Sequence, residues 1–357
     1  MTTVRVAHAG ADYDVVVGDL ASALPRIEAS AIGQPLPLIS DQRIFSHHGS
    51  LLARLALPEP ILLPEGEAAK DWSTLREITD RLAAIKVKRG TPIIALGGGS
   101  VGDVAALAAS LFKRGCPIIH VPTTLLAQAD SAIGGKTAID AAGQKNLVGT
   151  FHHPLLVIAD PALLDTLDRR QLRSGYAEVV KYGLIDDPGF FAWCEANGRR
   201  LLDGDGECRR FAIEHCVRAK ARFVTADPND TQGTRALLNM GHTFGHAIEA
   251  LAGHALPHGE AVAIGLALAF DFSAELGICP RAEADRVRAH LRSVGLPTSA
   301  SDIGLGCDGP MIHQAMLADK KASAAGLTLI LAQRIGKAFV AKTVDSARLS
   351  DFLERSA

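Results

Sequence analysis

The first half of the chain repeats one pattern, in which a short run rich in β-branched residues is followed by a segment with helical spacing. The runs are VRVAH, DYDVVVG, PLPLIS, EPILLP, TPIIALGGG, CPIIHVPTT and PLLVIAD. Such alternation predicts parallel strands joined by crossover helices. Beyond residue 165, long segments such as RSGYAEVVKYGLI and GEAVAIGLALAFDFSAELG have helical periodicity, and strand candidates are few. We therefore predict a Rossmann-like α/β domain over residues 1–165 and a mainly α-helical domain over 166–357, with a ligand cleft between them.

Composition argues against two classes of partner. The formal net charge of −2 leaves no basic excess to neutralise a phosphate backbone, so we expect no nucleic-acid partner. The longest apolar run, AVAIGLALAF, is about half the length that a membrane span requires, and the N-terminus lacks the pattern of a signal peptide. The six cysteines include no CxxC pair, so we expect reduced thiols. The expectation is a cytoplasmic protein that does not act on a membrane.

A glycine-rich turn follows the run TPIIAL directly and precedes a helical segment. Gly97, Gly99 and Gly102 give the spacing GxGxxG, which lets the backbone approach a pyrophosphate and leaves helix N–H groups for the anion. The motif alone is weak, because glycine turns also serve only to make tight corners, but its place between strand and helix favours dinucleotide binding. The acidic residue that the ordinary fingerprint has about 20 positions further on is missing, so the fold is a variant. We expect Asp41, at the end of PLPLIS, to bind the ribose hydroxyls.

A second stretch, TTLLAQADSAIGGKTAIDAAGQKNLVGTF, sets four polar residues among small and apolar ones. These are Asp130, Lys136, Lys145 and Asn146. A lone lysine is usually a solvated surface residue. Here lysines recur among neighbours too small to cover them, which favours a binding site.

Four histidines lie in the apolar segment NMGHTFGHAIEALAGHALPHGEAVAIG. His242 and His246 are four residues apart, on one face of a helix, and His258 opens the next helical segment. A threonine stands where the HExxH motif of a metalloprotease has its glutamate, so a hydrolytic zinc site is disfavoured. Any one of these histidines alone would be read as structural. Together with Glu178, on an apolar helical stripe, the cluster supplies the two imidazoles and one carboxylate of a catalytic zinc site, whereas His254 is expected at the surface.

Taken together, the motifs resemble the 3-dehydroquinate synthase family, a branch of the sugar phosphate cyclases, over nearly the whole chain. The segments that carry the resemblance are PEGEAAK, GGGSVGD, KRG, VPTTLLAQADSAIGGKTAID, KNLVGTF, GYAEVVKYGLI, RALLNMGHTFGHAIE, HGEAVAIG and DKK. The resemblance implies an NAD-binding α/β domain and an α-helical domain, with catalysis at the interdomain cleft. It also implies conversion of 3-deoxy-D-arabino-heptulosonate 7-phosphate to 3-dehydroquinate and phosphate, the second step of the shikimate pathway to aromatic amino acids.

Carried over residue by residue, the resemblance implies four groups of site residues. The metal, Zn²⁺ or Co²⁺, is expected on Glu178, His242 and His258. The NAD site is expected to include Asp41, Glu67, Lys70, Gly98, Gly99, Asp103, Thr123, Thr124, Asp130, Lys136, Lys145 and Thr166. The substrate is expected to meet Lys136, Asn146, Lys181, Lys220, Arg235, Asn239, His246 and one lysine of DKK, either Lys320 or Lys321. Arg114, in FKRG, matches an arginine that the family sends into the neighbouring subunit's site, which implies a homodimer.

The implied chemistry uses NAD transiently. NAD takes a hydride from a substrate hydroxyl, and the resulting ketone acidifies the neighbouring C–H so that phosphate can leave. The hydride then returns, the pyranose ring opens, and an intramolecular aldol reaction closes the carbocycle. A divalent metal lowers the pKa of the substrate hydroxyl, and the cations around the phosphate hold it both before and after it leaves. The substrate's own phosphate is implied to assist the elimination.

One segment departs from the family. Where the family has a DExExGxR run before RALLN, this chain has ADPNDTQGTR, which keeps Asp227 and adds one residue. Thr231 or Gln232 stands where a glutamate is expected. In the family the missing acid would orient a lysine or arginine of the pocket, and Asp230 is the residue placed to substitute for it.

Three other functions fit parts of the sequence. A sibling cyclase acting on sedoheptulose 7-phosphate or glucose 6-phosphate would use the same NAD and metal. An iron- or zinc-dependent polyol dehydrogenase shares the architecture and the glycine turn but gives no reason for Lys136, Asn146, Arg235 and Asn239. A non-catalytic NAD-binding protein has no need for three metal-ligand candidates, so metal analysis of the purified protein separates it from the others.

Overall fold

The computed structural model describes residues 1–7, 12–31, 36–55, 59–230, 233–253, 256–318, 322–323 and 326–356. The chain forms two compact units, of which the first comprises residues 1–168 and 206–229 and the second residues 169–205 and 230–357. These divisions differ from the predicted domains, 1–165 and 166–357, mainly because residues 206–229 belong with the first unit. The predicted fold class is confirmed, with a parallel-dominant α/β unit and a mainly helical one.

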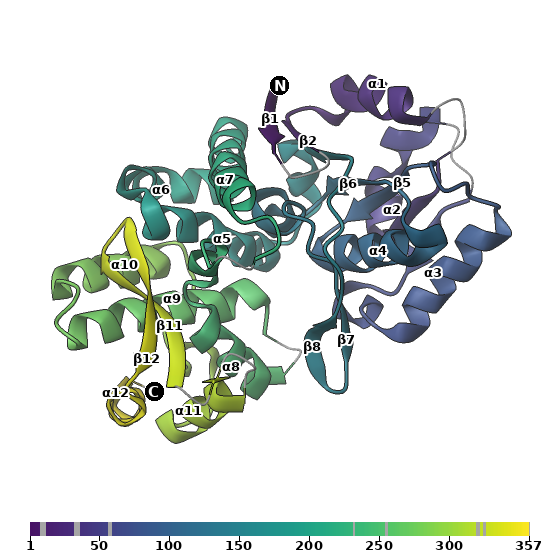
Figure 1. Ribbon diagram of the computed structural model, residues 1–357. Coiled ribbons are helices and arrows are strands. Elements are labelled where there is room, and N and C mark those ends of the chain that lie inside the picture. Colours follow the sequence, from purple (N-terminus) through teal and green to yellow (C-terminus); the bar gives the residue numbers. More distant parts are fainter. Residues whose placement is uncertain are drawn as a thin grey trace. The chain divides into compact units, whose positions relative to one another are not determined.

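The first unit is organised around a sheet whose described strands follow the order β1-β2-β9-β6-β5-β3-β4 (Figure 1). β1 and β2 pair antiparallel, and the other neighbours pair parallel. Parallel strands require crossover connections, which the alternating sequence pattern supplies. The strands are β1 (Thr2–Val6), β2 (Tyr13–Val17), β3 (Leu38–Asp41), β4 (Ile61–Leu63), β5 (Ile93–Gly97), β6 (Ile118–Pro122) and β9 (Leu156–Ala159).

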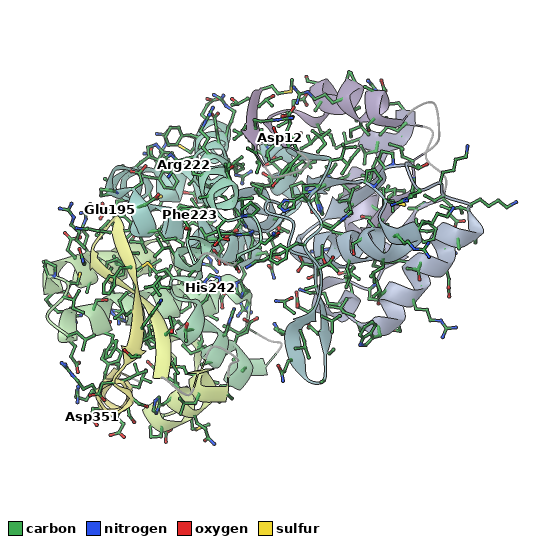
Figure 2. The ribbon with its side chains drawn as sticks, in the orientation of Figure 1. Asp12, Glu195, Arg222, Phe223, His242 and Asp351 are labelled. Carbon is green, nitrogen blue, oxygen red and sulfur yellow. The ribbon has the colours of Figure 1, made fainter. Side chains whose placement is uncertain are left out.

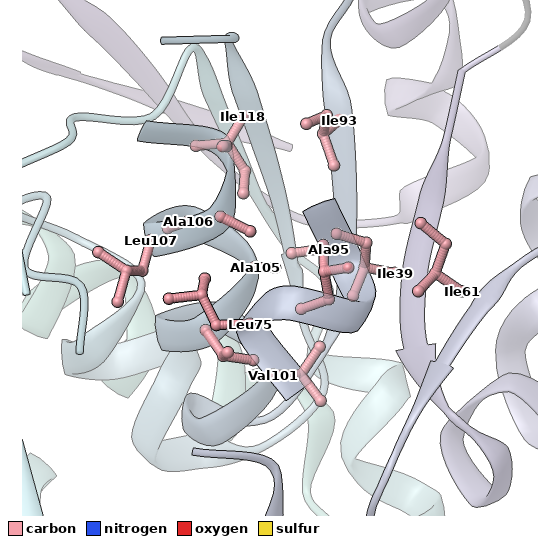
Figure 3. Packing of buried hydrophobic residues seen from close by; sticks show 14 of the residues in the cluster. Ile39, Ile61, Leu75, Ile93, Ala95, Val101, Ala105, Ala106, Leu107 and Ile118 are labelled. Carbon is pink, nitrogen blue, oxygen red and sulfur yellow. The ribbon is translucent and has the colours of Figure 1, made fainter. Parts of the chain in front are cut away.

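Helices cover both faces of this sheet, so its central strands are apolar on both sides. Successive residues of a strand point to opposite faces. Ile39 and Ile93 therefore pack into one core, shown in Figure 3, with α3 and α4, while Leu38 and Ile94 pack into the other core with α1 and α2. The helices are α1 (Leu20–Ala31), α2 (Gln42–His48), α3 (Trp72–Ala84) and α4 (Gly99–Leu111).

Two further elements complete the first unit. The hairpin of β7 (Ile139–Ala141) and β8 (Gln144–Val148) forms a separate two-stranded sheet. Helix α7 (Gly206–Ala226) contacts β1 and β2 of the large sheet. Its helical period was readable from the sequence, but the surface on which it packs was not.

The second unit is built from helices around a core that α8, α9, α11 and α12 share with strand β11. A three-stranded antiparallel sheet in the order β10-β11-β12 was not foreseen, although two apolar runs flank the turn RIGK. The elements are α5 (Arg169–Asp186), α6 (Pro188–Leu202), α8 (His242–Ala252), α9 (His258–Glu275), α10 (Arg281–Ser293), α11 (Gly309–Ala318), α12 (Ser346–Ser356), β10 (Ala322–Ser323), β11 (Gly326–Arg334) and β12 (Lys337–Val344).

Two expectations from composition can be compared with the structure. No disulfide joins any of the six cysteines, all of which the structure describes. Among the described helices, none has both the length and the apolar character needed to cross a membrane.

A buried histidine sits between the helices of the second unit. His290, on α10, has its Nε2 atom 3.1 Å from the hydroxyl oxygen of Tyr176, which donates to the carbonyl oxygen of Cys194 at 3.2 Å. Burial lowers the pKa of His290 from 6.5 to about 4. The folded protein therefore prefers the neutral imidazole, whereas the unfolded chain takes up the proton at higher pH.

We predict that this histidine makes the protein less stable as the pH falls from 6.5 to 4. Over that window the unfolded chain binds more protons than the folded one, so His290 costs up to about 3 kcal/mol of unfolding free energy. Denaturant midpoints measured across the window should fall less steeply for His290→Leu than for the unmodified chain. Tyr176→Phe, which breaks the same hydrogen bond but removes no titrating imidazole, should keep the original slope. Equal slopes for the unmodified chain and His290→Leu would contradict the assignment.

Candidate active site

Two glycines allow three helices of the second unit to approach closely. A Cβ atom on Gly259, in the first turn of α9, would lie 1.9 Å from the carbonyl oxygen of Ser174 on α5. A Cβ atom on Gly265, also on α9, would lie 1.9 Å from the carbonyl oxygen of Gly241, which precedes α8. Either distance is far below van der Waals contact. Only glycine at both positions lets α9 pack this closely against α5, through Gly259, and against the start of α8, through Gly265.

This approach brings together the three residues predicted to hold a metal. Glu178 lies on α5, His242 opens α8 and is labelled in Figure 2, and His258 opens α9. The Nε2 atoms of both histidines are 3.5 Å from the same carboxylate oxygen, Oε1 of Glu178. In a tetrahedral zinc site, with ligand bonds of about 2.0–2.2 Å, neighbouring ligand atoms are about 3.4 Å apart. The donor set and its spacing therefore fit a zinc-sized divalent ion.

The electrostatics of the cluster also fit a cation. Oε1 of Glu178 is buried and has no hydrogen-bond partner among the described residues, while Oε2 pairs with the ammonium of Lys181. Burial opposes the charge of Glu178, but Lys181 and the two imidazoles outweigh it and hold the pKa of the carboxyl well below its usual value. Burial also lowers the pKa of His242, which favours the neutral, metal-binding form.

Of the other residues predicted for the second unit, one lies close to this cluster and two lie just before it in the sequence. The ring of His246 lies 5.4 Å from that of His242 and 5.9 Å from that of His258, centroid to centroid. Arg235 and Asn239 begin and end η6 (Arg235–Asn239), the short 3-10 helix just before α8, and Arg235 is buried. These positions are compatible with substrate contact, which stays a prediction.

In the first unit, a small cavity lies at the glycine-rich turn between β5 and α4. Gly98, Gly99, Asp103, His120 and Lys136 contribute to its lining. Gly98 is the N-cap of α4 and has no side chain to occupy the first N–H groups of the helix. Those N–H groups and the helix dipole favour an anion, so the turn fits a pyrophosphate.

Lys70 joins this turn to the β7–β8 hairpin. Its buried ammonium donates to the carboxylate of Asp103 at 2.7 Å and to the amide oxygen of Asn146. Asn146 has a φ of +53°, and its N–H donates to Asp140 at 2.7 Å. The structure thus places Asn146, predicted to contact substrate, against a lysine predicted to bind NAD.

A second ion pair in the first unit joins two predicted residues. The ammonium of Lys220, on α7, donates to the carbonyl oxygen of Asp130 at 2.7 Å and also to its carboxylate. Glu67 accepts a hydrogen bond from Ser100, in the first turn of α4, at 2.6 Å. Lys136 and Lys145 are exposed.

Several residues predicted for the NAD site also have local structural partners. Asp41 caps α2 by accepting from the N–H of Ile44 at 2.8 Å, so one of its oxygens is occupied. Thr124 accepts from the N–H of Ala127 at 3.2 Å, and the hydroxyl of Thr166 lies 2.8 Å from Nε2 of His48. The hydroxyl of Thr123 is buried without a partner among the described residues. Binding of NAD by these four residues stays a prediction.

The segment that departs from the family is described in part, one buried acid was not predicted from the sequence, and several predicted positions lie outside the described residues. Asp227 is fully buried, and Asp230 has a φ of +54°. The sequence did not single out Glu249, which is buried and lies against His258, although a lone acid in the apolar run HAIEALA was the available signal. Outside the described residues lie Thr231, Gln232, His254, Lys320 and Lys321.

We predict that Gly265→Ala disrupts the cluster. The added methyl group would force α9 away from Gly241, and the displacement moves His242 relative to Glu178. Overpacking of this kind costs roughly 1–3 kcal/mol or more. We expect a lower melting temperature and loss of bound zinc, measured by emission spectrometry after dialysis. Gly306→Ala, where a Cβ atom meets nothing within 4 Å, is the control and should keep both. Full zinc content in Gly265→Ala would show that the helix contact does not position the cluster.

Sequence comparison finds two family models that match consecutive parts of the chain. The model described as 3-dehydroquinate synthase N-terminal matches residues 60–174, and the one described as 3-dehydroquinate synthase C-terminal matches residues 175–322. A 3-dehydroquinate synthase from Zymomonas mobilis is 47% identical, with 89% of this chain and 88% of that protein covered. One from Caulobacter vibrioides is 46% identical, with 98% of each covered.

Solved structures of related synthases match the chain in fold at lower sequence identity. A 2-epi-5-epi-valiolone synthase from Streptomyces hygroscopicus, with NAD⁺ and Zn²⁺ bound, has a TM-score of 0.88 and 30% identity over 97% of each chain. A 2-deoxy-scyllo-inosose synthase with carbaglucose-6-phosphate, NAD⁺ and Co²⁺ has a TM-score of 0.87 and 26% identity over the whole of both chains. Because the two family models together span most of the sequence and the relatives match at nearly full length, the chain belongs to the 3-dehydroquinate synthase family.

Proposed function

We propose that the chain is a 3-dehydroquinate synthase, which converts 3-deoxy-D-arabino-heptulosonate 7-phosphate to 3-dehydroquinate and phosphate. The observation that carries the proposal is the meeting of Glu178, His242 and His258 in a chain whose relatives bear this name at 44–47% identity. The cluster fits a zinc-sized ion, and the glycine turn of the first unit fits a dinucleotide. A chain that only bound a dinucleotide would have no use for the buried carboxylate and the two imidazoles.

We propose NAD as the dinucleotide and Zn²⁺ or Co²⁺ as the metal, because the two related synthases were solved with these groups. NAD would lie on the N–H groups at the start of α4, beside Lys70 and Asp103. The metal would be held by the three-residue cluster. When bound, NAD takes a hydride from a substrate hydroxyl and later returns it, and the metal polarises that hydroxyl as a Lewis acid.

The cations of the chain would bind the two anions of the substrate. A heptulosonate phosphate carries a carboxylate and a phosphate, and each needs its own positive partner. Lys136, Asn146, Asn239, His246 and the partner subunit's arginine at position 114 are proposed for the phosphate. This assignment leaves Lys220, Arg235 and a lysine of the DKK segment for the carboxylate.

Two of these cations are held in place by the fold. Arg235 is buried, and a guanidinium can grip a carboxylate through two parallel hydrogen bonds. The ammonium of Lys220 is kept by the carbonyl and carboxylate oxygens of Asp130, so its position is fixed before substrate arrives. Lys181, paired with Glu178, maintains the negative charge of the carboxylate that faces the imidazoles.

The test of the function is the choice of substrate. A sibling cyclase would act on sedoheptulose 7-phosphate or glucose 6-phosphate, neither of which carries a carboxylate. A site whose cations are placed to bind a substrate carboxylate rejects an analogue that lacks this group, so we expect the heptulosonate phosphate to be preferred by roughly a thousandfold in kcat/KM. Phosphate release with NAD and zinc present measures the preference. Comparable turnover of sedoheptulose 7-phosphate would replace this function with that of the sibling.

We predict that Arg235→Ala lowers kcat/KM for the heptulosonate phosphate by roughly a hundredfold or more, as expected for loss of a charge-assisted contact. The matched control is Arg348→Ala, at an exposed position of α12, which should keep the original value. The carboxylate assignment fails if Arg235→Ala is as active as this control.

We also propose a cytoplasmic homodimer in which each subunit lends Arg114 to its neighbour. The lack of a disulfide among the six cysteines fits the reducing compartment that we propose. Arg114 is exposed and has a φ of +64°, following Lys113 at +50° and preceding Gly115 at +114°. A left-handed backbone at non-glycine residues costs energy, and such strain is often found at functional turns.

Mixing two inactive variants tests the shared site. In a hybrid dimer, the Arg114→Ala subunit keeps its own Glu178 and receives Arg114 from the Glu178→Ala subunit. One of the two sites is therefore intact. After random exchange of subunits we expect about a quarter of the original activity. If confirmed exchange restores no activity, Arg114 acts within its own chain.

A further inference from the structure

Both ring nitrogens of His258 face carboxylates. Nε2 lies 3.5 Å from Oε1 of Glu178, and Nδ1 lies 3.2 Å from Oε2 of Glu249. Glu249 is buried and lies on α8, seven residues after His242 and therefore on the same face of that helix. The carboxylate of Glu249 thus reaches from α8 to the first residue of α9.

We propose that Glu249 is a positioning residue that accepts a hydrogen bond from Nδ1–H of His258 and thereby aims Nε2 at the metal position. The proposal rests on the proposed function, because it requires the metal that this function uses. An imidazole carries one proton in its neutral form, so a partner that accepts from Nδ1 leaves the lone pair on Nε2. A carboxylate partner also makes the ring a stronger ligand.

His242 is oriented by a different partner. Its Nδ1 atom lies 3.1 Å from the carbonyl oxygen of Met240, which fixes the same tautomer through the main chain. The two histidines therefore present Nε2 to the same oxygen of Glu178, one through a backbone acceptor and one through a side chain. Because only the latter can be removed by substitution, Glu249 offers a direct test.

A second metal position is the competing interpretation of the same atoms. Ligand atoms of His246, Glu249 and His258 lie within 4.8 Å of one another. An ion there, together with one bound by Glu178, would require His258 to coordinate through both nitrogens as an imidazolate, which means removing its last ring proton. A hydrogen bond to a buried carboxylate needs no such deprotonation, so the orienting role is favoured.

The test compares metal affinity and cobalt spectra of the full-length protein. Zn²⁺ affinity is measured by competition with a chromophoric chelator, and the ligand field by the visible absorption of the Co²⁺ form. We expect Glu249→Ala to weaken zinc binding about 10–100-fold and to change the cobalt bands. Glu249→Gln should lie between, with nearly unchanged bands, because its amide oxygen still accepts from Nδ1–H without the charge.

The control is Glu260→Gln, which also removes a buried carboxylate close to His258, this one on α9. Glu260 pairs with Arg170 at 2.7 and 2.9 Å, so its loss should lower the melting temperature and leave zinc affinity unchanged. Should Glu249→Ala fail to fold, Glu249→Gln still decides the matter by its affinity and spectrum.

Three results separate the possible failures. Unchanged affinity and spectrum in both Glu249 variants, with loss of zinc in His258→Ala, would overturn the positioning role alone. Two ions in the unmodified chain and one in Glu249→Ala would favour the second metal position instead. Unchanged affinity in Glu178→Ala and His258→Ala would overturn the proposed metal site itself, and the role of Glu249 with it.

Discussion

The arrangement of the helical unit depends on the buried carboxylate of Glu178, whose charge must be compensated by neighbouring groups. An ionised group taken out of water is costly unless it is paired and hydrogen-bonded. Here the ammonium of Lys181 meets one oxygen, and the imidazoles of two other helices approach the second oxygen at 3.5 Å. Those imidazoles reach it only because Gly259 and Gly265 let α9 touch α5 and the start of α8. The glycines, the histidines and the carboxylate therefore form one arrangement rather than separate motifs.

The fold by itself does not decide the reaction. One architecture can serve several unrelated functions. Function follows from the residues of the site. The proposed substrate has two anionic groups and would use Lys220 and Arg235 as partners, whereas a simple alcohol offers these cations no anion to bind.

Much of this organisation could be predicted from the sequence. Alternation of β-branched runs with helical spacing predicted the parallel sheet, because a strand buried on both faces must be apolar throughout. The glycine turn and the histidine cluster were visible because their residue types are unusual in their surroundings. Glu178, His242 and His258 could be grouped by chemistry and by resemblance before any geometry was available.

What the sequence did not reveal depends on packing between distant segments. The strands of the first half were recognised because they alternate with helical segments. The apolar runs of β11 and β12 lie in a mainly helical region without such alternation, so they were not predicted as strands. Helix α7 has an ordinary helical period, and nothing in it specifies the sheet of the first unit as its partner. Asp41 looked like a ribose ligand, but local geometry also makes it the cap of α2. Glu249 acts on a residue of the next helix, a relationship that helical spacing within one segment cannot show.

The most direct measurement of the central claim is anomalous diffraction at the zinc absorption edge, from crystals grown with zinc and NAD. We expect one peak, about 2.0–2.2 Å from a carboxylate oxygen of Glu178 and from Nε2 of both His242 and His258. A peak held instead by His246 and Glu249, or no peak in the presence of zinc and NAD, would contradict it.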